Sequence, residues 1–262
     1  MSLKTGSLLT IDVGNTRTKW ALFNAVGELS NQGVCANANL AMAEFLPKST
    51  LCKYVVIANV TGEKVAQMLT EKCVALGLTI TWARASHLAC SVKNNYDNPN
   101  QLGVDRWAAI IAAWHHYQSP CAVVNVGTAV TIDALASNKE GAEFLGGLIL
   151  PGLNLMQQNL VQGTHDIASG VVNQIGKAAN FPTNTADAVV TGACLAIVGA
   201  IAEMVEKLQA SCEQVMIILS GGDARILMPL LAQKFNTDSL KRVVLNDNLV
   251  LQGLYLLERE QE

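Results

Sequence analysis

Two segments of the chain repeat one pattern, in which an apolar strand enters a short turn with a single glycine and a second strand follows. The first segment is Leu8–Phe23, LLTIDVGNTRTKWALF, and the second is Cys121–Leu135, CAVVNVGTAVTIDAL. When they are aligned on the glycine, three positions correspond: Asp12 with Asn125, Gly14 with Gly127, and Thr18 with Thr131. A repeated supersecondary unit predicts a chain built from two related halves. Two such turns facing each other can hold a polyphosphate from both sides.

The hydrophobic periodicity along the rest of the chain supports this division. It predicts strands at residues 7–13, 17–23, 28–34, 54–59, 78–82, 121–126, 129–135, 143–150, 215–219 and 242–245. It predicts helices at 61–76, from Val104 to before Pro120, at 153–161, at 186–209, after Asp223, and at 248–258, with loops at 93–102 and 162–185. Both halves run from hairpins through helices to a strand, a glycine turn and a helix. We therefore expect an α/β fold of two lobes, residues 1–117 and 118–262.

Composition narrows the class of protein. Half of the residues are hydrophobic and 15% are charged, which predicts a large core and leaves apolar surface for an oligomer interface. The net charge of −3, without a basic block, argues against nucleic acid or anionic lipid as the main partner. No run of 18 apolar residues occurs, which argues against a membrane span. Seven scattered cysteines without a CxxC pair are typical of reduced thiols in a cytosolic protein.

The turn of the first hairpin has the residues of a phosphate-binding loop. Asp12 ends an apolar strand, where an unpaired carboxylate is costly but a hydrated Mg²⁺ finds the hard oxygen ligand that it prefers. Gly14 lets the backbone approach a phosphate, and Asn15 and Thr16 offer hydrogen-bond donors. The alternative is a plain β-hairpin whose turn favours Gly-Asn. The second copy of the pattern favours the phosphate-binding interpretation.

Two glycine-containing turns follow in the second half. In the second hairpin, Thr128 comes directly after Gly127 and can bond a β- or γ-phosphate, although a plain hairpin is again the alternative. Residues 220–223, SGGD, follow a buried strand and open a helix, where backbone amides suit an anion and glycines admit a flat ring. A tight strand–helix turn explains that segment equally well. GxGxxG and GxxxxGK[ST] motifs are absent from the sequence, which excludes the Rossmann and P-loop classes.

A polar loop at Asn95–Trp107, NYDNPNQLGVDRW, ends where a helix is predicted to begin. Asp105 at this position can accept a proton from a substrate hydroxyl. The adjacent Arg106 can bind a carboxylate or phosphate group of the substrate. Without other motifs, an aspartate stabilised by the helix dipole beside an exposed arginine is the simpler interpretation.

Taken in order along the chain, these motifs resemble those of type III pantothenate kinases, which belong to the acetokinase/Hsp70/actin-like superfamily. The matching segments are DVGNT at 12–16, YDNPNQLGVDR at 96–106, NVGTAVTID at 125–133, GGLILPG at 146–152, NTADAV at 184–189 and LSGGD at 219–223. The resemblance implies two ribonuclease-H-like lobes with mixed sheets flanked by helices. It also implies transfer of phosphate from ATP to the 4′-hydroxyl of pantothenate, the first step of coenzyme A biosynthesis. A cytoplasmic homodimer that uses Mg²⁺ and a monovalent cation, K⁺ or NH₄⁺, is the expected form.

The resemblance assigns roles to individual positions. Asp105 is the expected general base. The expected pantothenate contacts are Tyr96, Gly103, Val104, Asp105, Arg106 and Thr185. The expected ATP contacts are Asp12, Val13, Gly14, Asn15, Thr16, Arg17, Thr18, Lys19, Thr128, Gly221 and Gly222, with Mg²⁺ held near Asp12 through water.

One position departs from the family pattern. The second phosphate loop of the family usually reads Asp-x-Gly-Thr, and that aspartate helps to bind the monovalent cation, whereas this chain has Asn125. An amide oxygen can coordinate K⁺ but brings no charge, so we expect a weaker or altered cation requirement. Two alternatives to the kinase are a sugar kinase of the same superfamily and a nucleotide-binding regulatory protein without catalysis. The LGVDR segment argues against the first, and the presence of Asp12, Asp105 and Thr128 argues against the second.

Overall fold

The structure is a computed structural model that describes residues 6–40, 52–164, 176–235 and 243–260. The chain forms two compact units, each made from more than one stretch of sequence. Unit 1 comprises Met1–Gln118, Ser137–Leu145 and Asn248–Glu262, and unit 2 comprises Ser119–Ala136 and Gly146–Asp247. The predicted lobe boundary at residues 117/118 stays a prediction.

Unit 1 contains a five-stranded sheet in the order β3-β2-β1-β4-β5. The strands are β1 (Ser7–Val13), β2 (Arg17–Phe23), β3 (Leu29–Ala36), β4 (Cys52–Asn59) and β5 (Thr79–Trp82). The pairs β1–β2 and β2–β3 are antiparallel, whereas β1–β4 and β4–β5 are parallel. The first hairpin thus supplies the centre of the sheet, and its turn lies at the end where β1 stops at Val13.

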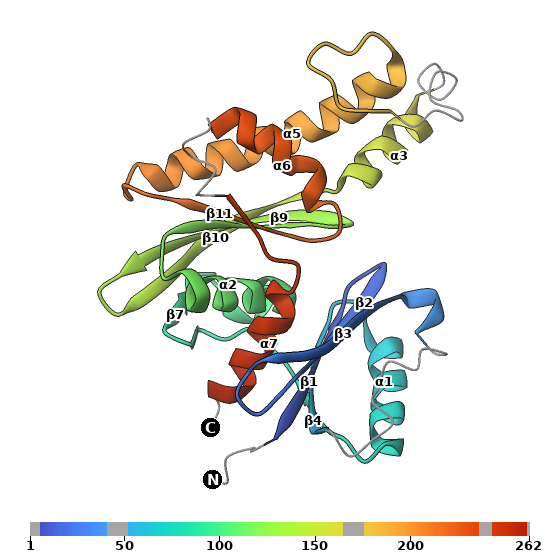
Figure 1. Cartoon of the computed structure of the whole chain (residues 1–262), viewed down its shortest axis with the longest axis vertical. Coiled ribbons are helices and arrows are strands. Elements are labelled where there is room, and N and C mark those ends of the chain that lie inside the picture. Colours follow the sequence, from blue (N-terminus) through green and yellow to red (C-terminus); the bar gives the residue numbers. More distant parts are fainter. Residues whose placement is uncertain (1–5, 41–51, 165–175, 236–242, 261–262) are drawn as a thin grey trace. The chain divides into compact units, whose positions relative to one another are not determined.

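Helices cover both faces of this sheet (Figure 1). Alternate β1 residues, Leu9 and Ile11 among them, pack with Leu69 and Cys73 of α1 (Glu63–Ala75) because successive strand side chains point to opposite faces. The opposite face carries α7 (Leu249–Glu260), which contacts β1, β2 and β4 and packs closely on α2 (Val104–Tyr117). Helix α2 therefore has its predicted position in the chain and is fixed to the sheet through α7.

The second sheet has seven strands in the order β12-β11-β8-β9-β10-β7-β6. They are β6 (Leu88–Ala89), β7 (Val92–Asn94), β8 (Cys121–Val126), β9 (Ala129–Asn138), β10 (Gly141–Pro151), β11 (Met216–Ser220) and β12 (Val243–Leu245). Strands β8 and β9 are antiparallel, while β11 runs parallel to both of its neighbours, β8 and β12. The order β10-β9-β8-β11-β12 repeats the order β3-β2-β1-β4-β5. The internal repeat predicted from the two hairpins is confirmed.

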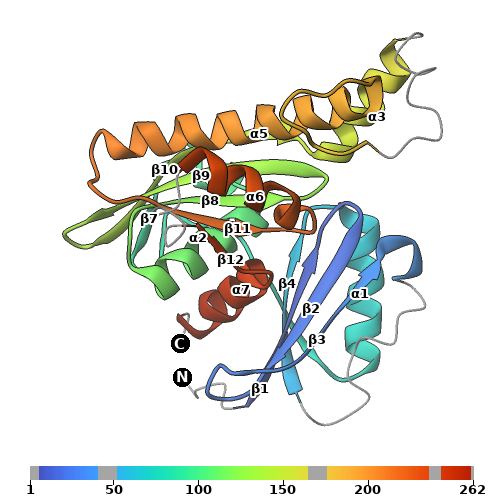
Figure 2. The ribbon, with the colours of Figure 1, turned by 45° about the horizontal axis from the view of Figure 1, so that its top comes forward.

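Three helices of unit 2 lie on one side of its strands (Figure 2). They are α3 (Leu153–Gly163), α5 (Thr185–Gln209) and α6 (Ala224–Phe235). The core between helices and sheet includes Val124, Ile132, Ile197 and Leu219. Helix α5 is long and apolar enough to cross a membrane by length and composition, with a mean hydropathy of 2.1 over 18 residues, of which 44% are buried. A core helix of a soluble protein meets the same two criteria, so the predicted lack of a membrane partner stays a prediction.

The predicted elements differ from the observed ones mainly between the two hairpins. The short hairpin of β6 and β7 and the 3₁₀ turns η1 (Asn37–Asn39) and η2 (Pro99–Gln101) were not predicted, because segments of two or three residues are too short for a periodic pattern. The predicted loop at 162–185 includes the last residues of α3, and its residues 165–175 lie outside the described part of the chain. The seven cysteines are all free thiols, as expected.

Candidate active site

The two repeated hairpins differ by one residue in the turn. In the first, Val13 pairs with Thr18 and Asp12 with Lys19. In the second, Val126 pairs with Val130 and Asn125 with Thr131. Accordingly, the amide of Gly14 donates to the carbonyl of Arg17 at 3.1 Å, three residues on, whereas that of Gly127 donates to Ala129, two residues on, at 3.1 Å. The alignment of Thr18 with Thr131 is therefore wrong in register, because Lys19 occupies the position across from the acid in the first copy.

Asp12 sits at the end of β1 in a setting that penalises its charge. Burial raises the pKa of the Asp12 carboxyl to about 7, and the nearby Asp105 carboxylate acts in the same direction, while Lys19 opposes both. Asp12 is the predicted metal-binding residue and Asp105 the predicted base, and both belong to unit 1. The Asp105 carboxylate is near enough to Asp12 to raise the pKa of its carboxyl. A carboxyl group whose ionisation is opposed by burial and by a second carboxylate makes a favourable place for a divalent cation.

Asp105 lies in the first turn of α2, where the helix dipole favours its negative charge. Its Oδ1 accepts a hydrogen bond from the backbone amide of Arg106 at 2.9 Å. The helix begins after Gly103, and a Cβ added there would lie 2.7 Å from the same Oδ1. Glycine at 103 therefore leaves the space that the Asp105 carboxylate occupies.

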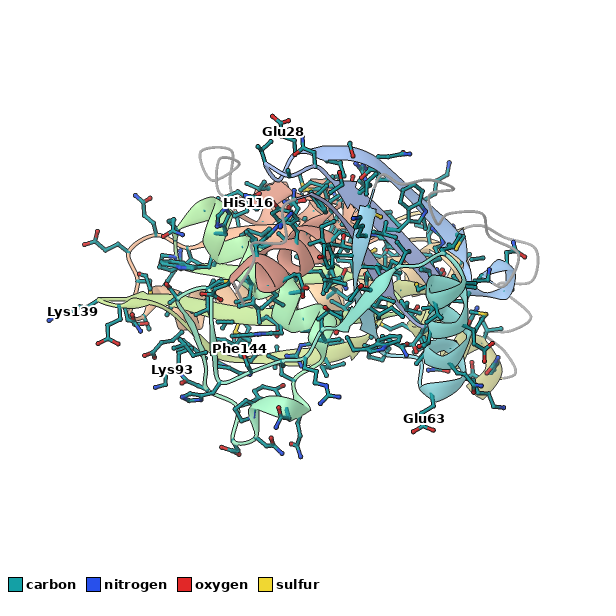
Figure 3. The ribbon with its side chains drawn as sticks, turned by 90° about the horizontal axis from the view of Figure 1, so that it is seen from below. Glu28, Glu63, Lys93, His116, Lys139 and Phe144 are labelled. Carbon is teal, nitrogen blue, oxygen red and sulfur yellow. The ribbon has the colours of Figure 1, made fainter. Side chains whose placement is uncertain are left out.

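Arg106 is 6% exposed and packs against two aromatic rings that also contact each other. Its Nη1 donates to the hydroxyl of Tyr96 at 3.0 Å, and its guanidinium carbon is 5.7 Å from the Tyr96 ring centre and 5.9 Å from that of Phe144. Phe144, which is labelled in Figure 3, is fully buried on β10. The centre of its ring lies 5.4 Å from that of the Tyr96 ring. Such cation–π contacts are stronger where water is excluded. The two rings and the Tyr96 hydroxyl thus limit the directions in which the Arg106 guanidinium can point.

The loop that carries Tyr96 is anchored from beneath by Asn94, which is fully buried. The Asn94 side chain donates to the carbonyls of Ser86 at 3.1 Å and Pro99 at 3.4 Å, and it accepts from the amide of Tyr96 at 3.1 Å. Neither Asn94 nor Phe144 was singled out from the sequence. Both residues lie near recognised motifs in the sequence. Their roles depend on contacts in three dimensions, which no spacing of residues along the chain indicates.

In unit 2, three segments that are distant in sequence meet at the second glycine turn. The amide of Gly152 donates to the carbonyl of Thr128 at 2.9 Å, and that of Asp223 donates to Val126 at 3.1 Å. A Cβ on Gly152 would lie 2.6 Å from the Thr128 oxygen, and one on Gly221, whose φ is 98°, would overlap the Val126 backbone. The predicted NVGT, LPG and SGGD motifs are therefore in backbone contact.

The remaining predicted residues of unit 2 occupy accessible or partly buried positions. Asn125 is partly buried at the end of β8, with Thr131 and Ser220 as its strand neighbours on either side. Thr128 is exposed on the turn, and Gly222 is exposed beside Gly221. Thr185 is exposed and begins α5, after an Asn184 cap whose side chain accepts from the amide of Asp187 at 2.9 Å. Asn125 therefore has a residue with a hydroxyl group beside it on each neighbouring strand, and hydroxyl and amide oxygens are ligands that hard cations accept.

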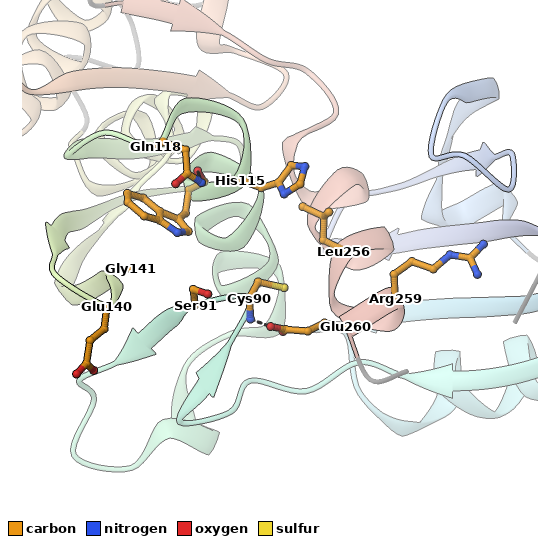
Figure 4. A pocket seen from close by; sticks show the side chains of 10 residues that line it. Cys90, Ser91, His115, Gln118, Glu140, Gly141, Leu256, Arg259 and Glu260 are labelled. Atoms are coloured by element: carbon orange, nitrogen blue, oxygen red, sulfur yellow. Dashed lines mark hydrogen bonds between the residues drawn. The ribbon is translucent and has the colours of Figure 1, made fainter. Parts of the chain in front are cut away.

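Within the described residues, no group of three or more His, Cys, Asp or Glu side chains is placed to hold a metal. A magnesium ion at Asp12 would therefore rely on few protein ligands, which suits an ion that keeps several waters and binds nucleotide phosphates. Unit 1 also has a pocket of about 600 Å³ whose lining includes Cys90, His115 and Glu260 (Figure 4). None of the predicted site residues lines this pocket.

Comparison with known proteins adds the identity of the fold and family. A family model of type III pantothenate kinase matches residues 8–207. A type III pantothenate kinase of Methylobacillus flagellatus is 44% identical over 256 residues, which cover 96% of this chain and 98% of the relative.

Solved structures support the fold. A protein from Campylobacter jejuni described as a Baf family transcriptional activator aligns with a TM-score of 0.60 at 19% identity, covering 97% of this chain and 98% of that one. One from Sinorhizobium meliloti described as a 2-dehydro-3-deoxygalactonokinase gives 0.57 at 14% identity, covering 96% and 98%. These likenesses show the fold of the actin-like ATPase and sugar kinase group, as predicted. With the family model covering most of the sequence and close relatives spanning nearly all of it, the chain belongs to the type III pantothenate kinase family.

Proposed function

We propose that this protein transfers the γ-phosphoryl group of ATP to the 4′-hydroxyl of pantothenate, the first step of coenzyme A biosynthesis. The observation that carries the proposal is the arrangement in unit 1, where Asp105 raises the pKa of Asp12 and is followed by Arg106, which packs against the rings of both Tyr96 and Phe144. Asp105 supplies a carboxylate that can accept the proton of an alcohol, and Arg106 supplies a fixed cation that can bind an anionic group. Pantothenate has an alcohol at one end and a carboxylate at the other.

The chemical step needs positioning and charge neutralisation more than covalent chemistry. In the proposed step the substrate hydroxyl oxygen bonds to the γ-phosphorus, its proton passes to the Asp105 carboxylate, and the bond to the β-phosphate oxygen breaks to release ADP. Gly103 and Val104 would contact the substrate where α2 begins, and Thr185 would supply a further contact. Arg106 would bind the carboxylate or another polar part of pantothenate, because its direction is fixed by the two rings.

The ATP phosphates would bind the glycine turns of the two units. In unit 1 these contacts would come from residues 12–19, and in unit 2 from Thr128, with Gly221 and Gly222 beside the nucleotide. Mg²⁺ bound near Asp12 would neutralise phosphate charge during transfer. The raised pKa of Asp12 supports this role, because a cation would favour the ionised carboxylate.

A monovalent cation is the second proposed ion, held through the amide oxygen of Asn125. Because that amide carries no charge, we expect a weak or altered requirement for K⁺ or NH₄⁺. Activity measured across KCl, NH₄Cl and NaCl tests this expectation. A steep K⁺ requirement with tight half-saturation would contradict it, and Asn125→Asp should move the enzyme toward such a requirement.

We also propose a cytoplasmic homodimer. Helix α5 exposes apolar surface, including Leu195, which is 53% exposed. Sedimentation equilibrium across a range of protein concentrations measures the state directly, and a monomer at every concentration would refute the dimer.

Release of ADP in a coupled assay tests the activity as a whole. Turnover that depends on pantothenate establishes the kinase, whereas turnover with hexoses in its place would point to a sugar kinase. Binding of ATP without turnover on any acceptor would favour a regulatory protein.

A further inference from the structure

The first glycine turn is held from behind by one asparagine that follows β3. Asn37 begins the 3₁₀ turn η1, more than twenty residues after the loop it contacts. Its side-chain Nδ2 donates to the carbonyl of Gly14 at 2.6 Å and to that of Asn15 at 3.1 Å. Its Oδ1 accepts from the hydroxyl of Thr18 at 2.8 Å, and its backbone amide donates to the carbonyl of Thr16 at 3.0 Å. Four residues of the loop are thus bonded to a single residue.

These bonds set the direction of the loop's peptide groups. The C=O and N–H of a trans peptide point in opposite directions, so the Gly14 carbonyl that faces Asn37 turns the N–H of Asn15 away from it. That N–H donates to no group within the described residues. Outward N–H groups on a glycine turn are the donors that bind phosphate oxygens. By accepting and donating hydrogen bonds on one side of the loop, Asn37 therefore holds the N–H groups on the opposite side in the direction that can bind phosphate.

The equivalent support in unit 2 comes from backbone. There the turn is one residue shorter, and its carbonyls at Val126 and Thr128 accept from the amides of Asp223 and Gly152. In unit 1 the strand carbonyl of Val13 likewise accepts a backbone amide, but the longer turn beyond it depends on the Asn37 side chain. A side chain can be removed by substitution, which makes this support testable.

We propose that Asn37 is a positioning residue for ATP, which holds the first phosphate loop in its binding conformation without itself contacting the nucleotide. This inference rests on the proposed role of residues 12–19 in binding the ATP phosphates. Thr18 belongs to the same device, because its buried hydroxyl orients the Asn37 amide rather than facing solvent.

The direct test replaces Asn37 with alanine and compares it with Asn39→Ala. Asn39 lies in the same 3₁₀ turn and is exposed, and its side chain makes no hydrogen bond within the described residues. We expect Asn37→Ala to raise the KM for ATP and the Kd of a non-hydrolysable ATP analogue roughly tenfold, the effect of about one or two lost net hydrogen bonds. The KM for pantothenate in Asn37→Ala should stay within about twofold of the wild-type value. In Asn39→Ala the KM values for ATP and for pantothenate should both stay within about twofold of wild type.

Two results would overturn the proposal. One is an ATP affinity in Asn37→Ala that equals that of Asn39→Ala. The other is an equal rise in the KM of both substrates, which a general loss of structure produces. If Asn37→Ala does not fold, Thr18→Val removes one of the bonds with a side chain of the same shape, and an unchanged ATP affinity in that variant also overturns the proposal.

Hydrogen exchange gives a readout that needs no turnover. Amides of residues 14–18 should exchange faster in Asn37→Ala than in wild type, while those of the unit 2 turn at 126–130 stay unchanged. Unaltered exchange at 14–18 contradicts the bracing role. Should the wild-type protein turn over no pantothenate, the proposed function fails, and binding of the ATP analogue together with hydrogen exchange then decides the role of Asn37.

Discussion

Gly253 of α7 lies against the backbone of α2, and we expect Gly253→Ala to disturb both stability and catalysis. A Cβ at this position would overlap the carbonyl of Ala108 and lie 2.8 Å from the Ala108 Cα. Ordinary contact begins at 3.4 Å, so clearing the Ala108 Cα alone requires the helices to separate by about 0.6 Å, the difference between these distances. Clearing the overlapped carbonyl requires a larger separation. Backbone atoms cannot relieve the overlap by changing rotamer as a flexible side chain can, so the helices themselves must move.

The expected cost follows from two opposing effects. Alanine gains about 1 kcal/mol over glycine in a helix interior, whereas overpacking a close contact costs about 1–3 kcal/mol and sometimes more. We therefore expect a net loss of up to a few kcal/mol in the free energy of unfolding. Ala108 lies one turn beyond Asp105 on α2, and misplacement of a catalytic group by about 1 Å can reduce the rate by roughly 10²-fold. A fall in kcat should accompany the loss of stability.

Urea denaturation and steady-state kinetics measure both effects, with Gly199→Ala as the matched control. Gly199 is an exposed helical glycine of α5, and an added Cβ there meets nothing within 4 Å. This control should gain about 0.5–1 kcal/mol from helix propensity alone. If Gly253→Ala gained stability as Gly199→Ala does and kept its kcat, the close packing of α2 on α7 would be refuted.

Three further predictions concern single side chains. Asp105→Asn should keep the fold and most of the ATP affinity while lowering kcat by roughly 10²–10⁴-fold, the usual range for a lost general base, and a nearly wild-type rate in a coupled ADP assay would remove Asp105 from that role. Phe144→Leu should raise the KM for pantothenate by roughly 2- to 30-fold, because a buried cation–π contact to Arg106 contributes about 0.5–2 kcal/mol; a larger change in the KM for ATP than for pantothenate would count against it. Ser91→Gly should raise the melting temperature, because Ser91 has a φ of 59° that glycine adopts at lower cost. The control Ser30→Gly in strand β3 should lower the melting temperature, and equal shifts in the two variants would show that backbone strain at Ser91 is negligible.

Much of the fold was predictable because its elements are long and periodic. The strands at 7–13, 17–23 and 121–126 were predicted to the residue, and the glycine-based repeat correctly indicated two related halves. That their sheets share one strand order is a finding of the structure. The helix predicted at 186–209 differs from α5 by one residue, since Asn184 caps its start and Thr185 is its first residue. Local patterns of this kind depend on neighbours in sequence, which a single chain displays directly.

What the sequence could not supply were contacts between distant segments. The correspondence of Thr18 with Thr131 is wrong because aligning glycines cannot reveal that one turn has an extra residue. Asn37 lies in an unremarkable Asn-Ala-Asn segment, and only the fold brings it beneath Gly14. Phe144 reads as an ordinary strand residue until its ring is seen against Arg106. The motif residues are candidates that the sequence alone can supply, whereas the residues that orient them become visible only through their contacts in the structure.

The place of α7 in the sequence has a consequence for how the protein is made. Unit 1 takes its sheet and α2 from the first 118 residues, yet α7, which covers β1 and α2, comes from residues 249–260. During synthesis the ribosome must therefore produce all of unit 2 before Ala21 and Phe23 can be covered by Leu251 and Tyr255. Until then this face of unit 1 remains apolar and exposed to chaperones and to aggregation. Folding of the unit that carries Asp105 is consequently a late event, even though most of its residues are synthesised first.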